Sequence, residues 1–191
     1  MPEADTFPII PREALFGNPT RAQGKISPDG KWLSWLAPYE GVLNIWLAPA
    51  DDPASARAMT KATARPIRQH FWPGDAKSLL YVQDKDGDEN FLLYRIDLET
   101  GEETTLTPFE HTRVQIVGAS ETIKDRILVG LNHRDPQFHD VYRLDLNTGD
   151  LTLVYENHSF AGFMADDTLT LRMAMRQNEA GGTDYFRFDD G

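Results

Sequence analysis

The residues whose types and spacing best suit chemistry are the acids of the segment DKDGDEN, residues 84–90. Asp84, Asp86 and Asp88 alternate along it, and loops rich in carboxylate oxygens bind calcium. An EF-hand loop, however, needs glycine at its sixth position and a bidentate glutamate at its twelfth, and this sequence has neither there. We therefore expect a solvated hairpin loop in which no metal ion is bound.

The histidines are the next candidates, because imidazole is the commonest general base near neutral pH. Two of them have an aspartate close by, His133 with Asp135 and His139 with Asp140. General base catalysis also needs a nucleophile within reach, and the pattern indicates none. We interpret all five histidines as loop and strand-edge residues, and expect neither catalytic nor cofactor-binding residues: His70, His111, His133, His139 and His158.

The composition narrows the function classes. The chain has 191 residues, of which 40% are hydrophobic and 26% charged, as in ordinary globular proteins. It has no cysteine, which excludes disulfides, cysteine-ligated zinc and a cysteine nucleophile. A net charge of −11 opposes binding to nucleic acid. Neither a signal-peptide pattern nor a long apolar run is present, so we expect a cytoplasmic chain that does not contact a membrane.

An internal repeat organises the sequence. FLLYRIDLETG at residues 91–101 returns as HDVYRLDLNTG at residues 139–149, and Asp97 and Asp145 are 48 positions apart (145 − 97). In both copies apolar and polar residues alternate, which predicts a strand with one apolar face. The strand then runs into the sequence Asp-x-x-Thr-Gly. A period of this length is typical of a supersecondary unit that repeats along the chain.

The repeat also predicts turns. A short aspartate side chain can accept hydrogen bonds from backbone N–H groups just ahead of it, and glycine can adopt a positive φ. A Pro-Asp-Gly turn precedes the strand at residues 31–37 in the same way. The residues that we assign to structural turns are Asp29 and Gly30, Asp97 and Gly101, and Asp145 and Gly149.

Fainter copies flank these two, so four units are visible, each with short apolar runs separated by turn signals. Units of 40 to 50 residues with four strands are typical of propeller blades, whereas a β-sandwich has no such long-period repeat. We predict an all-β propeller with about three complete four-stranded blades and a truncated fourth, with tryptophans packed between blades. An extended lead-in at 1–20 precedes the partial propeller domain at 21–191, whose blades are 21–64, 65–110, 111–157 and 158–191.

An ordered set of motifs also carries a family resemblance: SPDGKWLSWLAP, LNIWLAP, DGDENFLLYRID, LTPFEHTRVQI and LNHRDPQFHDVYRLDLNTG. Together they resemble the N-terminal propeller of prolyl oligopeptidase family serine peptidases, the group of acylaminoacyl peptidases and dipeptidyl aminopeptidases. The resemblance covers nearly the whole chain. It implies a ring of seven or eight blades followed by an α/β-hydrolase domain with a Ser-Asp-His triad. None of the six serines here lies in the G-x-S-x-G elbow that the triad requires.

The resemblance implies a non-catalytic propeller portion that admits only short peptides to the active site of a peptidase, with the C-terminal α/β-hydrolase domain and peptide substrates as partners. The rival interpretation is a stand-alone TolB-like propeller that binds proteins, since a fold alone does not determine function. Three blades and part of a fourth do not close a ring of seven or eight. We therefore also expect self-association through open propeller edges.

Overall fold

The computed structural model describes residues 9–17 and 20–189. These residues form one short helix, a 3-10 turn and four antiparallel sheets, which we number blades 1 to 4. The helix is α1 (Arg12–Phe16) and the 3-10 turn is η1 (Pro53–Ser55). Blade 1 contains β1 (Ala22–Ile26), β2 (Trp32–Tyr39), β3 (Val42–Pro49) and β4 (Arg57–Ala58). Blade 2 contains β5 (His70–Phe71), β6 (Ser78–Gln83), β7 (Leu92–Asp97) and β8 (Glu103–Thr105). Blade 3 contains β9 (Val114–Gly118), β10 (Arg126–Asp135), β11 (Phe138–Asp145) and β12 (Leu151–Tyr155). Blade 4 contains β13 (Gly162–Ala165), β14 (Leu171–Gln177) and β15 (Thr183–Arg187).

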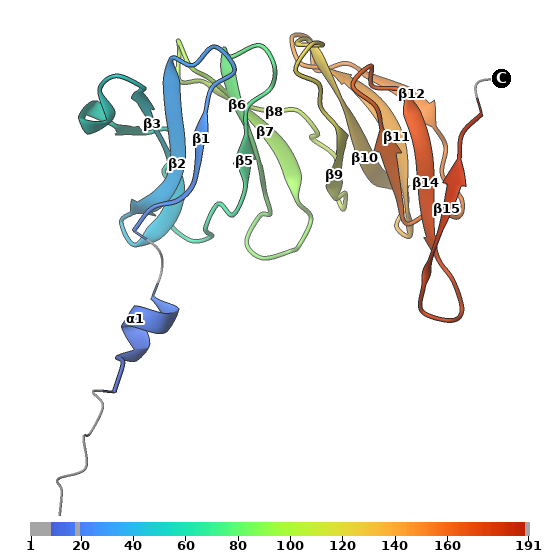
Figure 1. Cartoon of the computed structure of the whole chain (residues 1–191), viewed down its shortest axis with the longest axis horizontal. Helices are drawn as coiled ribbons and strands as arrows, with labels where there is room; N and C mark the ends of the chain where they lie inside the picture. The colour runs from blue at the N-terminus through green and yellow to red at the C-terminus, as the bar shows by residue number, and fades with distance from the viewer. Residues whose placement is uncertain (1–8, 18–19, 190–191) are drawn as a thin grey trace, which may run out of the picture.

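The blades stand side by side in chain order (Figure 1). Within each blade the strands pair in sequence order, so the first strand of every blade is an edge strand. This arrangement confirms the prediction of an all-β fold made of four-stranded propeller blades with a shorter fourth blade. Half of the predicted extended lead-in, residues 1–8 and 18–19, lies outside the described residues together with residues 190–191, and its described part contains α1. No helix in the described part of the chain is long and apolar enough to cross a membrane.

Blade 2 is buried on both of its faces. Ile96 and Leu98 pack against blade 1, whereas Leu80 and Leu93 pack against blade 3. Leu93 and Ile96 are both fully buried although they face opposite ways. The prediction of a single apolar face for the repeated strand is therefore wrong. A sheet that lies between two other sheets must bury both of its faces. In the sequence, the face that carries Leu93 does not look apolar, because Arg95 lies on the same face.

The tryptophans divide between the two faces of blade 1. Trp32 and Trp72 pack into the core shared by blades 1 and 2, as predicted. Trp35 and Trp46 instead pack on the opposite face of blade 1, against a small cluster of its own residues. For these two the interpretation as packing between blades is wrong within the described residues. Strand alternation explains the difference, because Trp32 and Trp35 are three positions apart on β2 and so point to opposite faces.

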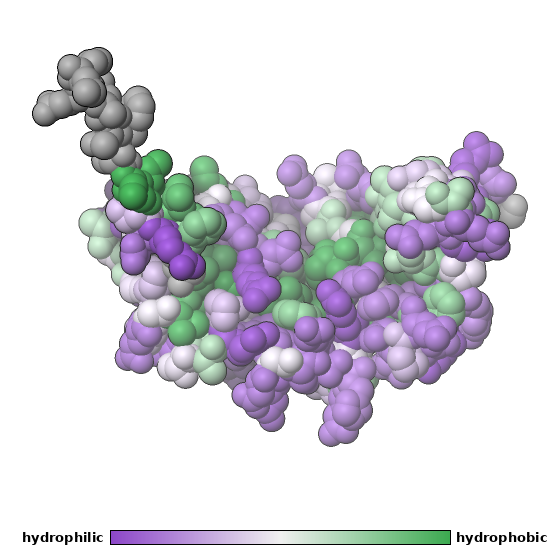
Figure 2. Space-filling view, turned by 90° about the horizontal axis from the view of Figure 1, so that it is seen from below, coloured by the Kyte–Doolittle hydropathy of each residue, from purple (hydrophilic) through white to green (hydrophobic). Residues whose placement is uncertain are grey.

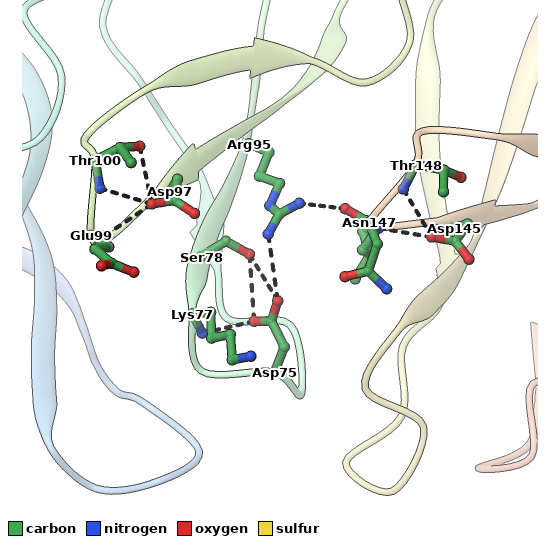
Figure 3. A network of polar contacts seen from close by, with 11 residues as sticks. Asp75, Lys77, Ser78, Arg95, Asp97, Glu99, Thr100, Asp145, Asn147 and Thr148 are labelled. Carbon is green, nitrogen blue, oxygen red and sulfur yellow. Dashed lines mark hydrogen bonds and ion pairs between the residues drawn. The ribbon is translucent and has the colours of Figure 1, made fainter.

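Arginines connect each of the first two blades to the next one. Arg57 of blade 1 donates a hydrogen bond to the carbonyl oxygen of Leu98 in blade 2 over 3.1 Å. Arg95 of blade 2 donates to the carbonyl oxygen of Leu146 in blade 3 and lies 3.9 Å from Asp75 (Figure 3). Leu98 and Leu146 are equivalent positions of the repeat, each directly after its turn aspartate. The repeated turn therefore presents its carbonyl oxygen to the preceding blade.

The hairpin between β10 and β11 is long. Its first strand extends to Asp135 and its second begins at Phe138. Arg134 binds the Asp140 carboxylate through two hydrogen bonds of 2.6 and 2.7 Å. Asp140 also accepts the backbone N–H of Asn157 over 2.7 Å. These charge-assisted bonds satisfy a buried carboxylate and hold the polar end of the hairpin in place.

Candidate functional site

The assigned turn residues all lie in tight turns between strands. The Asp97 Oδ1 atom accepts the backbone N–H groups of Glu99 and Thr100 over 3.0 and 2.8 Å (Figure 3). Asp145 accepts the equivalent pair from Asn147 and Thr148 over 2.8 and 3.0 Å. The φ angles of Gly101 and Gly149 are +72° and +79°. Asp29 accepts the hydroxyl of Ser27 over 2.6 Å and the backbone N–H of Lys31 over 3.2 Å, and the φ of Gly30 is +73°. These are structural contacts, and they lower the pKa of Asp97, chiefly through the Thr100 N–H.

Replacing Gly101 by valine tests the turn assignment. A Cβ atom at Gly101 meets nothing within 4 Å, so the cost is conformational, because a β-branched residue is forced to a φ of +72°. We expect Gly101→Val to lower the free energy of unfolding by about 1 kcal/mol or more in urea denaturation. Gly24→Val is the matched control, since that site is equally open and lacks a left-handed φ. Equal losses in both variants contradict the assignment.

The acidic loop that follows β6 is organised by an ion pair. Asp84 is buried and its carboxylate lies 3.0 Å from the Arg65 guanidinium. Asp88 caps its own turn by accepting the backbone N–H groups of Lys85 and Asn90 over 3.3 and 3.0 Å. Among the described residues there is no group of three or more histidines, cysteines or acids that could hold a metal ion. The loop therefore supplies a carboxylate partner for the Arg65 guanidinium.

A serine–histidine pair lies between blades 1 and 2, which the sequence did not indicate. The Ser34 Oγ atom is 2.9 Å from His70 Nε2 and accepts the Trp72 Nε1–H over 2.9 Å. Ser34 and His70 are 0% and 1% exposed, so a substrate carbonyl has no access to the hydroxyl. Burial, and secondarily the charge of Lys25, lowers the pKa of His70 to about 4. A serine without substrate access and such a weak base do not make a catalytic pair.

The other histidines are not assembled into a site. His133 stacks between Phe109 and Tyr142, with ring centroids 5.2 and 5.5 Å away. His139 is half-buried, and burial lowers its pKa, with the charge of Arg113 as a secondary cause. His111 and His158 are exposed. Stacking and strand pairing account for the two histidines that have an aspartate close by.

One open groove gathers residues from three blades. Its volume is about 900 Å³, and it is lined by β1, β5 and β9 together with the connections that lead into β5 and β9. The first strands of three neighbouring blades line the groove, so it lies along the edge of the row that these strands form, which we call the inner edge. Figure 2 shows the row of blades from below relative to Figure 1, with hydrophobic residues near the middle of a largely hydrophilic face. Apolar rings of Phe71 and Phe91 contribute to its walls.

The groove is basic although the chain carries a net charge of −11. Lys25, Arg65, Arg68 and Arg113 line it, and Asp84 is its one acidic residue. Asp84 is already paired with Arg65. Arg113 lies 5.4 Å above the ring of Phe91. A sequence signal exists but is weak: Arg65 and Arg113 are one repeat period apart (113 − 65 = 48), each in the connection that leads into the first strand of its blade.

The chain is similar in sequence to two peptidases. No family model matches the chain. Dipeptidyl aminopeptidase BIII of Pseudoxanthomonas mexicana is 51% identical over 180 residues, which cover 94% of this chain and 26% of that protein. Dipeptidyl peptidase family member 6 of Caenorhabditis elegans is 30% identical over 189 residues, which cover 94% of this chain and 25% of that protein. The chain thus spans about a quarter of the length of these relatives.

Solved structures agree on the fold. The β-propeller domain of the trilobed protease from Pyrococcus furiosus matches with a TM-score of 0.60 at 23% identity, covering 90% of this chain and 54% of that one. An acylaminoacyl peptidase from Pyrococcus horikoshii matches with a TM-score of 0.59 at 20% identity, covering 90% and 31%. TolB from Acinetobacter baumannii matches with a TM-score of 0.56 at 14% identity, covering 86% and 40%. At these identities the likeness concerns the propeller fold alone.

Proposed function

We propose that this chain, which is related to the propeller portion of prolyl oligopeptidase family serine peptidases, is the non-catalytic part of such an enzyme and admits short peptides to its active site. The observation that carries the proposal is the 51% identity to dipeptidyl aminopeptidase BIII over 94% of the chain. The partner in this proposal is an α/β-hydrolase domain with the catalytic triad. The peptide substrate passes along the inner edge of the blades.

A physical argument supports the gating role. Blades arranged in a ring leave a narrow central channel, which excludes folded proteins but accepts an extended peptide. The first strands of three blades line an open groove of about 900 Å³ here, and its walls contain both aromatic rings and charged side chains. Such mixed walls suit a peptide, whose backbone is polar and whose side chains vary. The TolB-like rival has only the shared fold in its favour. A G-x-S-x-G motif found further along the reading frame would decide against it.

Replacing the matching segment of dipeptidyl aminopeptidase BIII by this chain tests the proposal. We expect the chimera to release dipeptides from a hexapeptide and to leave a folded protein substrate uncut. The control is the same enzyme with the segment deleted, which should lose selectivity for size or fail to fold. A folded chimera that cleaves short and long substrates at equal rates, or that cleaves neither, contradicts the gating role.

A further inference from the structure

We propose that the basic groove on the inner edge of blades 1 to 3 binds the carboxylate-bearing part of an oligopeptide, with Lys25 and Arg68 as the residues that attract it. This inference rests on the proposed function and adds a preference for the charge of the peptide. It concerns the portion of a substrate that lies within the propeller and away from any catalytic centre.

The groove contains more cations than its one acidic residue can pair. Two of its four cations are already engaged, Arg65 by Asp84 at 3.0 Å and Arg113 by the face of the Phe91 ring. Lys25 and Arg68 have no ion-pair partner in the described part of the chain. Two positive charges in one concavity therefore remain available to an anion.

The positive charge of the groove contrasts with the acidic composition of the whole chain. The chain has 30 acidic and 19 basic residues, yet the acids of the neighbouring loop, Asp86, Asp88 and Glu89, do not line the groove. A concave surface of one sign between low-dielectric walls concentrates field lines, so it attracts the opposite charge more strongly than an exposed cation does. The groove should therefore favour a negatively charged ligand over an uncharged one.

The groove also contains hydrogen-bonding groups. Gln23 holds the backbone carbonyl of Arg68 over 2.6 Å, which fixes the connection that carries this arginine to the first strand of blade 1. His70 is also among the residues that line the groove, but it is 1% exposed, and its Nδ1 atom, which has no hydrogen-bond partner within the described residues, is buried beneath the surface. The walls thus combine two free cations, aromatic rings and polar groups, which matches an extended peptide with a carboxylate better than a compact inorganic anion.

Fluorescence anisotropy with the 191-residue chain tests the inference. Three hexapeptides with an uncharged fluorophore serve as probes: one with a free C-terminal carboxylate, one amidated with two internal glutamates, and one amidated and uncharged. At about 50 mM salt, where exposed charges still act over more than 10 Å, we expect both anionic peptides to bind about fivefold to tenfold more tightly than the uncharged one. The first two probes separate a terminal carboxylate from acidic side chains as the recognised group.

Two double variants locate the effect. Lys25→Gln with Arg68→Gln should remove the advantage of the anionic peptides. Lys61→Gln with Lys77→Gln is the control, because it makes the same change in net charge at exposed lysines outside the groove. Equal weakening by both double variants, or equal binding of all three peptides, overturns the inference. Neither result affects the size selectivity of the chimera, so the proposed function is judged separately.

Discussion

Leu93→Ala should lower the free energy of unfolding by about 2 to 5 kcal/mol, the range for large-to-small changes in a well-packed core. Leu93 is fully buried on β7, where blade 2 meets blade 3, and it packs in one cluster with Leu80, Val129 and Leu144. The shorter side chain loses apolar contacts with both blades and leaves a cavity. The two packed sheets cannot move together enough to fill it. Chemical denaturation followed by circular dichroism measures the loss.

Leu153→Ala is the matched control for this prediction. Leu153 is also a strand leucine, on β12, but it is 49% exposed. Its truncation should change stability by no more than about 0.5 kcal/mol. If both variants lose the same free energy, blades 2 and 3 do not share the core described above.

Stability should also fall as the pH is lowered, because of His70. Burial, and secondarily the charge of Lys25, lowers the pKa of this imidazole from 6.5 to about 4. Between pH 6.5 and about pH 4, His70 is protonated in the unfolded chain but neutral in the folded chain, so acid favours the unfolded state. The contribution of His70 to the free energy of unfolding is therefore complete above about pH 6.5. It decreases by about 3 kcal/mol in all as the pH falls to about 4.

Urea denaturation between pH 4 and pH 7 measures this effect in the wild type, in His70→Gln and in His111→Gln. His70→Gln should be less stable than the wild type at pH 7 and should lose much less stability on acidification. His111 is exposed in a loop, so His111→Gln should follow the wild type. Parallel pH profiles for wild type and His70→Gln would show that His70 is not a buried neutral imidazole.

The strand order was predictable because it depends on local signals that recur. The turn sequences at Asp97 and Asp145 and the alternation before them place two equivalent strands 48 residues apart (145 − 97), and the structure has β7 and β11 there. The faces of these strands were harder to predict. A polar residue such as Arg95 hides a buried face in the sequence, because its partner, the carbonyl of Leu146, comes from another blade.

The groove and the Ser34–His70 pair were not predictable for a related reason. Both bring together residues from different blades. Ser34 and His70 are 36 positions apart (70 − 34) and follow no motif, and the groove leaves only the weak signal that Arg65 and Arg113 are one repeat period apart. Packing between blades decides which side chains meet, and no local pattern encodes it. The length of the β10–β11 hairpin is equally hard to predict, because its polar sequence resembles a loop and the pairing of Arg134 with Asp140 is visible only in the structure.

We expect this chain to contain no catalytic serine of its own, because none of its serines lies in a G-x-S-x-G elbow. Intact-mass analysis after treatment with a fluorophosphonate tests it most directly, since such reagents react with the activated serine of serine hydrolases. Ser34 is the serine of most interest, because its Oγ atom lies 2.9 Å from His70 Nε2. It is fully buried, so we expect the reagent not to reach it. We predict that the folded chain remains unmodified at all six serines. A stoichiometric adduct on one serine, accompanied by hydrolysis of a dipeptide substrate, would contradict the account.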